Sequence, residues 1–193
     1  NIFTYVLSVL TVIKIQPARD TFLGASIPTL AYLIRLRLDH NLFGKFEKFR
    51  EQRAVDLITG LAQTIKYLHD AGICLRDLDF SSIMVTRNSD RGILRISEVK
   101  NSKMLGPEET CIGIFGDINF RAPEVLEGLP YNWKADSWSL GVIIFHMLTG
   151  SYPFSTAYSP SLKQDIIKGS PNLSLLRDMC YSELVIDLVS KLL

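Results

Sequence analysis

Arg76, Asp77 and Asp79 lie close together within the short segment Leu75–Asp79. A carboxylate that a loop holds beside an arginine can act as a general base, because it can accept the proton that a reacting hydroxyl group releases. Glu98 supplies another carboxylate farther along the chain. The alternative is that these residues are ordinary charges on a solvated loop, and the Arg-Asp pair alone fits both interpretations.

Short fragments before and after this segment form a longer pattern together with it. In chain order they are Tyr67–Ile73, Leu75–Leu78, Arg121–Glu124, Asp136–Gly141 and Tyr152–Phe154. In order and spacing, these fragments resemble those of the eukaryotic protein kinases. Three segments are most similar to the calcium/calmodulin-dependent group of Ser/Thr kinases: Asn41–Gly44, Tyr67–His69 and Met147–Phe154. The resemblance implies an α+β fold of the protein kinase type, with a mainly helical large lobe and the last strands of the small lobe.

The resemblance also assigns roles to individual residues. Asp77 takes the position of the catalytic base and Arg76 precedes it, although Leu75 replaces the usual histidine. Besides that base, phosphoryl transfer needs metal ligands that bridge the phosphates of ATP and cations that absorb the developing charge. The resemblance places the adenine pocket at Ile34, Leu36 and Met84. It places the metal ligands at Ser82 and Glu98.

Several positions depart from the family pattern. Asp79 replaces the lysine that neutralises the transferred phosphoryl group. Two unit charges ~4 Å apart interact by about 4 kcal/mol at an effective dielectric constant of ~20, and a carboxylate reverses the sign of this interaction. The carboxylate therefore opposes transfer. Ser82 replaces an asparagine and has a shorter reach, while the extra methylene of Glu98 shifts its oxygens from the octahedral geometry that Mg²⁺ demands. Glu98–Lys100 aligns with the metal-binding triplet of the family, in which Val99 replaces a phenylalanine and Lys100 a glycine. Asp117 replaces a threonine.

These departures predict a catalytically impaired kinase-like domain, a pseudokinase that serves as a binding or regulatory module. The alternative is an active ATP-dependent Ser/Thr kinase in which Asp77 is the base and Glu98 with Ser82 holds the metal. Mg-ATP is expected as a cofactor only if the full-length parent is active. The resemblance places the glycine-rich loop and the phosphate-binding lysine outside this chain, so we expect no tight binding of Mg-ATP by this fragment.

Composition restricts the class of partner. The chain of 193 residues has 21 basic and 20 acidic residues, and a net charge of +1 produces no long-range field that would attract nucleic acid. The basic cluster between Lys45 and Arg53 is interpreted as the solvated face of a helix. The apolar run Ile2–Ile13 is shorter than the ~20 residues that a membrane span needs. We therefore expect a protein partner or protein substrate, no nucleic acid and no membrane.

The three cysteines form no C-x-x-C pair. They are interpreted as reduced, partly buried thiols of a cytoplasmic or nuclear protein.

Hydrophobic periodicity predicts the elements that position the candidate site. From Arg50 to Gly72, apolar residues recur at helical spacing, and Asn88–Gly92 is a turn signal between two short strands of a hairpin, Ile83–Ile96. The segment Ala135–Leu148 is apolar on every side, which is typical of a central helix. Further helices are expected from Pro160 to Gly169 and from Ser182 onwards.

Strands are predicted over Ile2–Val12 and Leu30–Leu38. Residues 1–38 are accordingly expected to be a remnant of the small lobe, made of strands only. Residues 39–193 are expected to form a large lobe that is truncated at both ends. The missing small-lobe segment then counts among the partners of this chain, because these strands would otherwise present an unpaired sheet edge.

Overall fold

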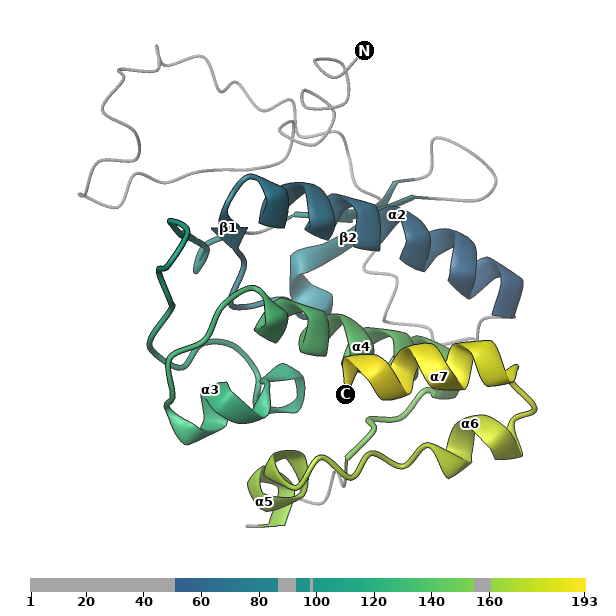
Figure 1. Cartoon of the computed structure of the whole chain (residues 1–193). Helices are drawn as coiled ribbons and strands as arrows, with labels where there is room; N and C mark the ends of the chain where they lie inside the picture. Colours follow the sequence, from purple (N-terminus) through teal and green to yellow (C-terminus); the bar gives the residue numbers. More distant parts are fainter. Residues whose placement is uncertain (1–50, 87–92, 98, 155–160) are drawn as a thin grey trace.

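The computed structural model describes residues 51–86, 93–97, 99–154 and 161–193, the coloured ribbon of Figure 1. The predicted strands Ile2–Val12 and Leu30–Leu38 lie outside the described residues, and so do the whole of unit 1–38 and the start of unit 39–193. The described elements, in chain order, are α2 (Glu51–Asp70), β1 (Ile73–Cys74), the 3₁₀ turn η2 (Phe80–Ser82), β2 (Ile83–Thr86), β3 (Ile93–Ile96), β4 (Lys103–Met104), the 3₁₀ turn η3 (Ile118–Phe120), α3 (Pro123–Glu127), α4 (Lys134–Thr149), α5 (Ser161–Ile167), α6 (Ser174–Asp178) and α7 (Glu183–Leu192).

Helix α4 forms the centre of the core. Every residue from Ala135 to Thr149 is buried except Ser137, and Trp138 and Ile143 are among the buried residues, as the apolar sequence predicts. Helices α2 and α7 both pack against it (Figure 1). Gly141 permits the approach of α7, because a Cβ atom at this position would lie 2.8 Å from Leu192 Cβ. This separation is closer than side-chain carbons normally come.

Helix α2 confirms the prediction made from its hydrophobic stripe. The apolar residues of the stripe are buried: Ala54, Ile58, Leu61, Ile65 and Leu68. Gly72, just after the last turn of α2, has φ +78°. A Cβ atom at this position would lie 2.9 Å from the backbone carbonyl oxygen of Leu105. Only glycine adopts this conformation and fits this contact without strain.

The strands are short and form two separate antiparallel pairs. The predicted hairpin is confirmed, since β2 pairs with β3 and Ile83 lies opposite Ile96. The sequence did not indicate the second pair, in which β1 lies beside β4 with Ile73 opposite Met104. Strands of two residues show no alternation that a sequence pattern could reveal.

Two of the short helices were not predicted either. Helix α3 begins at Pro123, and α6 buries Leu176 completely. Helix α5 lies within the predicted range Pro160 to Gly169. Helix α7 begins as predicted, with Ser182 as its N-cap.

A contact between distant parts of the chain fixes the start of α7. The Glu51 carboxylate, in the first turn of α2, accepts hydrogen bonds from the Ser182 backbone N–H at 3.0 Å and from Ser182 Oγ at 2.5 Å. These hydrogen bonds lower the pKa of Glu51.

The thiols differ in their surroundings. Cys74 and Cys111 are free and fully buried, and burial raises the pKa of each. Cys180 is exposed, in contrast to the partly buried thiol predicted for it.

No helix among the described residues has both the length and the apolar character needed to cross a membrane.

Candidate functional site

The backbone of the loop between β1 and η2 is held by a single buried carboxylate. Asp136, in the first turn of α4, accepts hydrogen bonds from the backbone N–H groups of Leu75 and Arg76, both at 2.8 Å. The same carboxylate lies 2.9 Å from His69 Nε2 at the end of α2. Arg76 has φ +65°, in the left-handed region, and these contacts stabilise it there. Asp136 thus holds the backbone of the loop and also contacts His69 at the end of α2.

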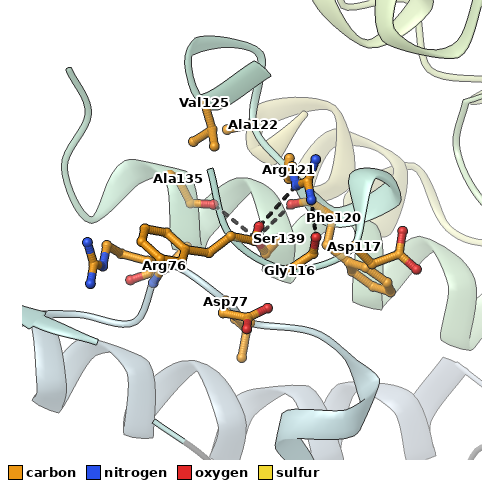
Figure 2. Close-up of a pocket in the computed structure, with 13 residues that line it drawn as sticks. Arg76, Asp77, Gly116, Asp117, Phe120, Arg121, Ala122, Val125, Ala135 and Ser139 are labelled. Atoms are coloured by element: carbon orange, nitrogen blue, oxygen red, sulfur yellow. Dashed lines mark hydrogen bonds between the residues drawn. The ribbon is translucent and has the colours of Figure 1, made fainter. Parts of the chain in front are cut away.

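Asp77, the predicted base, lies between two segments that follow β3. Asn101 Nδ2 donates a hydrogen bond to Asp77 Oδ2 at 2.7 Å. On the other side lies Gly116, at which an added Cβ would stand only 2.1 Å from Asp77 Oδ1 (Figure 2). A residue with a side chain does not fit at position 116 while Asp77 keeps this position.

The Asp79 side chain forms hydrogen bonds within the turn that it begins. It is the N-cap of η2, where its Oδ1 accepts hydrogen bonds from Ser82 N at 2.9 Å and from Ser81 Oγ at 2.7 Å. In return, Ser82 Oγ accepts a hydrogen bond from Asp79 N at 3.0 Å and donates one to the Asp79 carbonyl at 2.8 Å. Together, Asp79 and Ser82 form a capping box, in which each side chain satisfies the other residue's backbone.

Two arginines hold the segment opposite this loop. Arg76 donates from Nε to the Asn101 carbonyl, and its guanidinium lies over the Phe115 ring, 4.4 Å from the ring centroid. Arg121 donates from Nε to the Phe115 carbonyl at 3.0 Å and from Nη2 to the Gly116 carbonyl (Figure 2). A cation over an aromatic face is a favourable contact. The position of Gly116 against Asp77 is therefore stabilised by contacts of Arg121 with Gly116 and of both arginines with Phe115.

Asp117 is exposed and caps the following turn. Its Oδ1 accepts hydrogen bonds from Asn119 N and Asn119 Nδ2, both at 2.9 Å. A carboxylate cannot donate a hydrogen bond to Asp77 as the hydroxyl of a threonine could.

Two small pockets lie on either side of Asp77. One is lined by Arg76, Gly116, Asp117 and Arg121 with apolar neighbours, and it is the pocket drawn in Figure 2. The other is lined by Ser81, Ser82, Lys100 and Asn101 with two apolar side chains. Asp77 lines both pockets, and each lining contains both acidic and basic side chains.

The described part of the predicted metal site does not fit Mg²⁺. Ser82 is buried, and its hydroxyl already donates and accepts within the capping box. Among the described residues, no three His, Cys, Asp or Glu side chains come together as a metal site. Glu98, the other predicted ligand, lies outside the described residues.

The predicted site residues are thus only partly brought together. Arg76, Asp77, Asp79 and Ser82 lie in one loop and its turn. Met84 follows in β2 with its backbone opposite Arg95, whereas Ile34 and Leu36 lie outside the described residues. Sequence reasoning missed Asn101 and Phe115. The one available signal was an amide side chain directly after the aligned triplet Glu98–Lys100.

Comparison with known proteins gives one family. The model of the protein kinase domain matches residues 30–193. The ovarian-specific serine/threonine-protein kinase Lok of Drosophila melanogaster is 36% identical over 112 residues, which cover 56% of this chain and 24% of that protein. The serine/threonine-protein kinase atg1 of Dictyostelium discoideum is 28% identical over 174 residues, which cover 86% of this chain and 26% of the relative.

The serine/threonine-protein kinase nekl-2 of Caenorhabditis elegans is 29% identical over 126 residues, which cover 65% of this chain and 35% of that protein. The chain thus spans only about a quarter to a third of the length of these relatives.

Proposed function

Since this chain belongs to the protein kinase family, we propose that it is part of a kinase-like domain that has lost phosphotransfer and serves as a binding or regulatory module. In this proposal residues 39–193 form the large lobe and residues 1–38 the last strands of the small lobe. The family match and the helix-rich described part support the assignment of the large lobe.

The observation that carries the proposal is the capping box of Asp79 and Ser82. By resemblance, these positions belong to a phosphate-neutralising lysine and a metal-binding asparagine. Here the first is a carboxylate and the second a buried hydroxyl, and the two bind each other's backbone. Both groups are used in stabilising a turn, so neither is free to serve a phosphate or a metal.

Charge supports the same proposal. Asp77, Asp79 and Asp117 are all carboxylates, and no ion pair formed between described residues includes any of them. Phosphoryl transfer adds negative charge that must be stabilised by cations or metal ions. Asp77 and Asp117 line the same pocket, and their negative charge opposes the approach of ATP phosphates.

An active Ser/Thr kinase is the second candidate, and one observation favours it. Asp136 still holds the Arg76 backbone and so keeps the base position of Asp77 well formed. In an active enzyme Asp77 would accept the proton of a protein hydroxyl, and Glu98 with Ser82 would be the metal ligands. Mg-ATP would be the phosphate donor, with its adenine against Ile34, Leu36 and Met84.

The finer assignments are also proposals. Similarity to the calcium/calmodulin-dependent group rests on Asn41–Gly44, Tyr67–His69 and Met147–Phe154. The relatives named above are all Ser/Thr kinases, which supports a protein as the partner or substrate. A cytoplasmic or nuclear location is proposed from the reduced state of the cysteines.

Calorimetric titration of the whole protein with Mg-ATP tests the proposal. We expect no magnesium-dependent binding in the low-micromolar range, either by the whole protein or by this fragment. The same titration of Asp79→Lys with Ser82→Asn should show whether the capping-box positions limit binding. Tight, magnesium-dependent binding by the unmodified protein would contradict the proposal and favour the active kinase.

A further inference from the structure

Asn101 contacts both residues at the centre of the loop, one through its side chain and one through its backbone. Its amide donates a hydrogen bond to Asp77 Oδ2 at 2.7 Å, and its carbonyl accepts one from Arg76 Nε. In the described part of the chain, no other residue forms hydrogen bonds with the side chains of both Arg76 and Asp77. Asn101 therefore binds the side chains of two successive residues of the loop.

A tight turn presents Asn101 in this position. The Val99 carbonyl accepts hydrogen bonds from Ser102 N at 3.0 Å and from Ser102 Oγ at 2.8 Å, which closes the turn around residue 101. Beyond the turn, Leu105 N donates to the Gly72 carbonyl at 2.7 Å, next to the paired strands β1 and β4. Asparagine is among the residues that favour such turns. The amide is thus held by the backbone and does not depend on a flexible loop.

The loop side of the contact is equally constrained. The Arg76 backbone is bound to buried Asp136, and the Gly116 backbone lies against the other oxygen of Asp77. Asp77 lacks an ion-pair partner among the described residues, and its carboxylate accepts a hydrogen bond from the neutral Asn101 amide. A hydrogen bond from an amide to a carboxylate is stronger than one between neutral groups.

We propose that Asn101 is a positioning residue that clamps the Arg76 and Asp77 side chains and thereby fixes segment 99–105 against the loop. The Asn101 clamp is defined as the contacts of Asn101 with Arg76 and Asp77. It goes beyond the proposed function, because it concerns the conformation of the site and holds whether or not phosphate is transferred. Asp77 then serves as an internal acceptor that joins two loops.

The chain contains a matched control for the clamp. Asn119 Nδ2 donates to Asp117 Oδ1 at 2.9 Å, which is the same pair of groups at an exposed turn with only two residues of separation. Hydrogen exchange of the whole protein should compare Asn101→Ala with Asn119→Ala. We expect about a tenfold rise in exchange over 73–78 and 99–105 for Asn101→Ala, the size that loss of one charge-assisted hydrogen bond gives. Asn119→Ala should leave these segments unchanged.

Changing the chemistry of the Asn101 side chain distinguishes a role of its hydrogen bond to Asp77 from a role of its packing alone. Asn101→Asp places a second carboxylate at hydrogen-bonding distance from Asp77, which raises the pKa of the pair above the ordinary value of about 3.9. The charged groups that line the pockets around this pair are Arg76, Asp117, Arg121, Asp136 and Lys100. The raised pKa makes Asn101→Asp closest to the unmodified protein at acid pH and increasingly less stable as pH rises from about 4 to about 7.

The swapped double variant Asp77→Asn with Asn101→Asp keeps one carboxylate and one amide, so it should recover most of the lost protection and lose the added pH dependence. Equal exchange in Asn101→Ala and Asn119→Ala, or no rescue by the swap, would overturn the inference. Neither result depends on ATP binding, so failure of the clamp and failure of the proposed function are distinguishable.

Discussion

Asp79 shows how a substitution at one residue changes both charge and local structure. By resemblance its position carries a lysine, yet the carboxylate accepts hydrogen bonds from Ser81 Oγ and Ser82 N at the start of η2. Reintroducing lysine would supply the missing cation and remove the cap. In the proposed function, a structural role therefore replaces a chemical one at this position.

Substitutions at Asp79 separate the charge from the cap. Asp79→Asn should leave the free energy of unfolding unchanged to within about 0.5 kcal/mol, since asparagine caps as well as aspartate. Asp79→Ala and Asp79→Lys should each lower it by roughly 0.5 to 2 kcal/mol, because the cap is lost. Urea unfolding monitored by circular dichroism measures the difference. Equal losses for Asn and Ala would show that the capping box contributes nothing.

The sequence predicted the residues of the loop better than their contacts. Asp77, Asp79 and Ser82 are close in sequence, so the resemblance was enough to group them. The contact of Asn101 with Asp77 joins residues of different loops, and no periodicity or spacing marks such a contact in one sequence. Its prediction would have required the course of the backbone after β3.

At the scale of elements, long periodic segments were predictable and short ones were not. Helices α2 and α4 and the β2–β3 hairpin follow from apolar spacing and a turn signal. Helices α3 and α6 have five residues each, too few for a hydrophobic period to repeat. Their positions are determined by packing against elements that lie elsewhere in the chain.

The contact between α4 and α7 depends on the absence of a side chain at Gly141. Gly141→Ala would place Cβ 2.8 Å from Leu192 Cβ and 3.0 Å from Leu193 Cδ2, so α7 must shift. We expect the free energy of unfolding to fall by about 1 to 3 kcal/mol, as overpacking of a core does.

Gly60→Ala is the matched control. It lies inside α2 with nothing within 4 Å of its added Cβ, and it should raise stability by roughly 0.5 to 1 kcal/mol through helix propensity. Thermal unfolding of both variants makes the comparison. A stabilised Gly141→Ala protein would disprove the close approach of α7.

The contact between α2 and α7 should depend on pH. Hydrogen bonds from Ser182 lower the pKa of Glu51. Because the folded-state pKa is below the unfolded value, the stabilisation is present above the unfolded value of about 4.3 and is lost as pH falls through the lowered folded value. Glu51→Gln should therefore reduce the acid-induced loss of stability. Parallel stability curves for both proteins below about pH 5 would contradict this assignment.

At the scale of the whole molecule, the proposed function separates membership of the kinase family from the chemistry of the family. The protein kinase match covers residues 30–193 and the described helices surround α4, so the scaffold of the large lobe is kept. The loop that Asp136 holds is also kept. The changes are concentrated in side chains that would bind phosphate and metal. The resemblance predicts this separation because a fold tolerates many surface substitutions, whereas a phosphoryl-transfer site depends on a few particular groups.

Phosphotransfer to a generic peptide by the whole protein tests the central claim most directly. We expect none from the unmodified protein, and no measurable difference between it and Asp77→Asn. The reversal Asp79→Lys, Ser82→Asn, Glu98→Asp, Val99→Phe and Lys100→Gly should restore some transfer only when all are combined, because these groups act as one unit. Asp77→Asn in that background should abolish the gain. Transfer by the unmodified protein that is lost in Asp77→Asn would contradict the account and identify an active kinase.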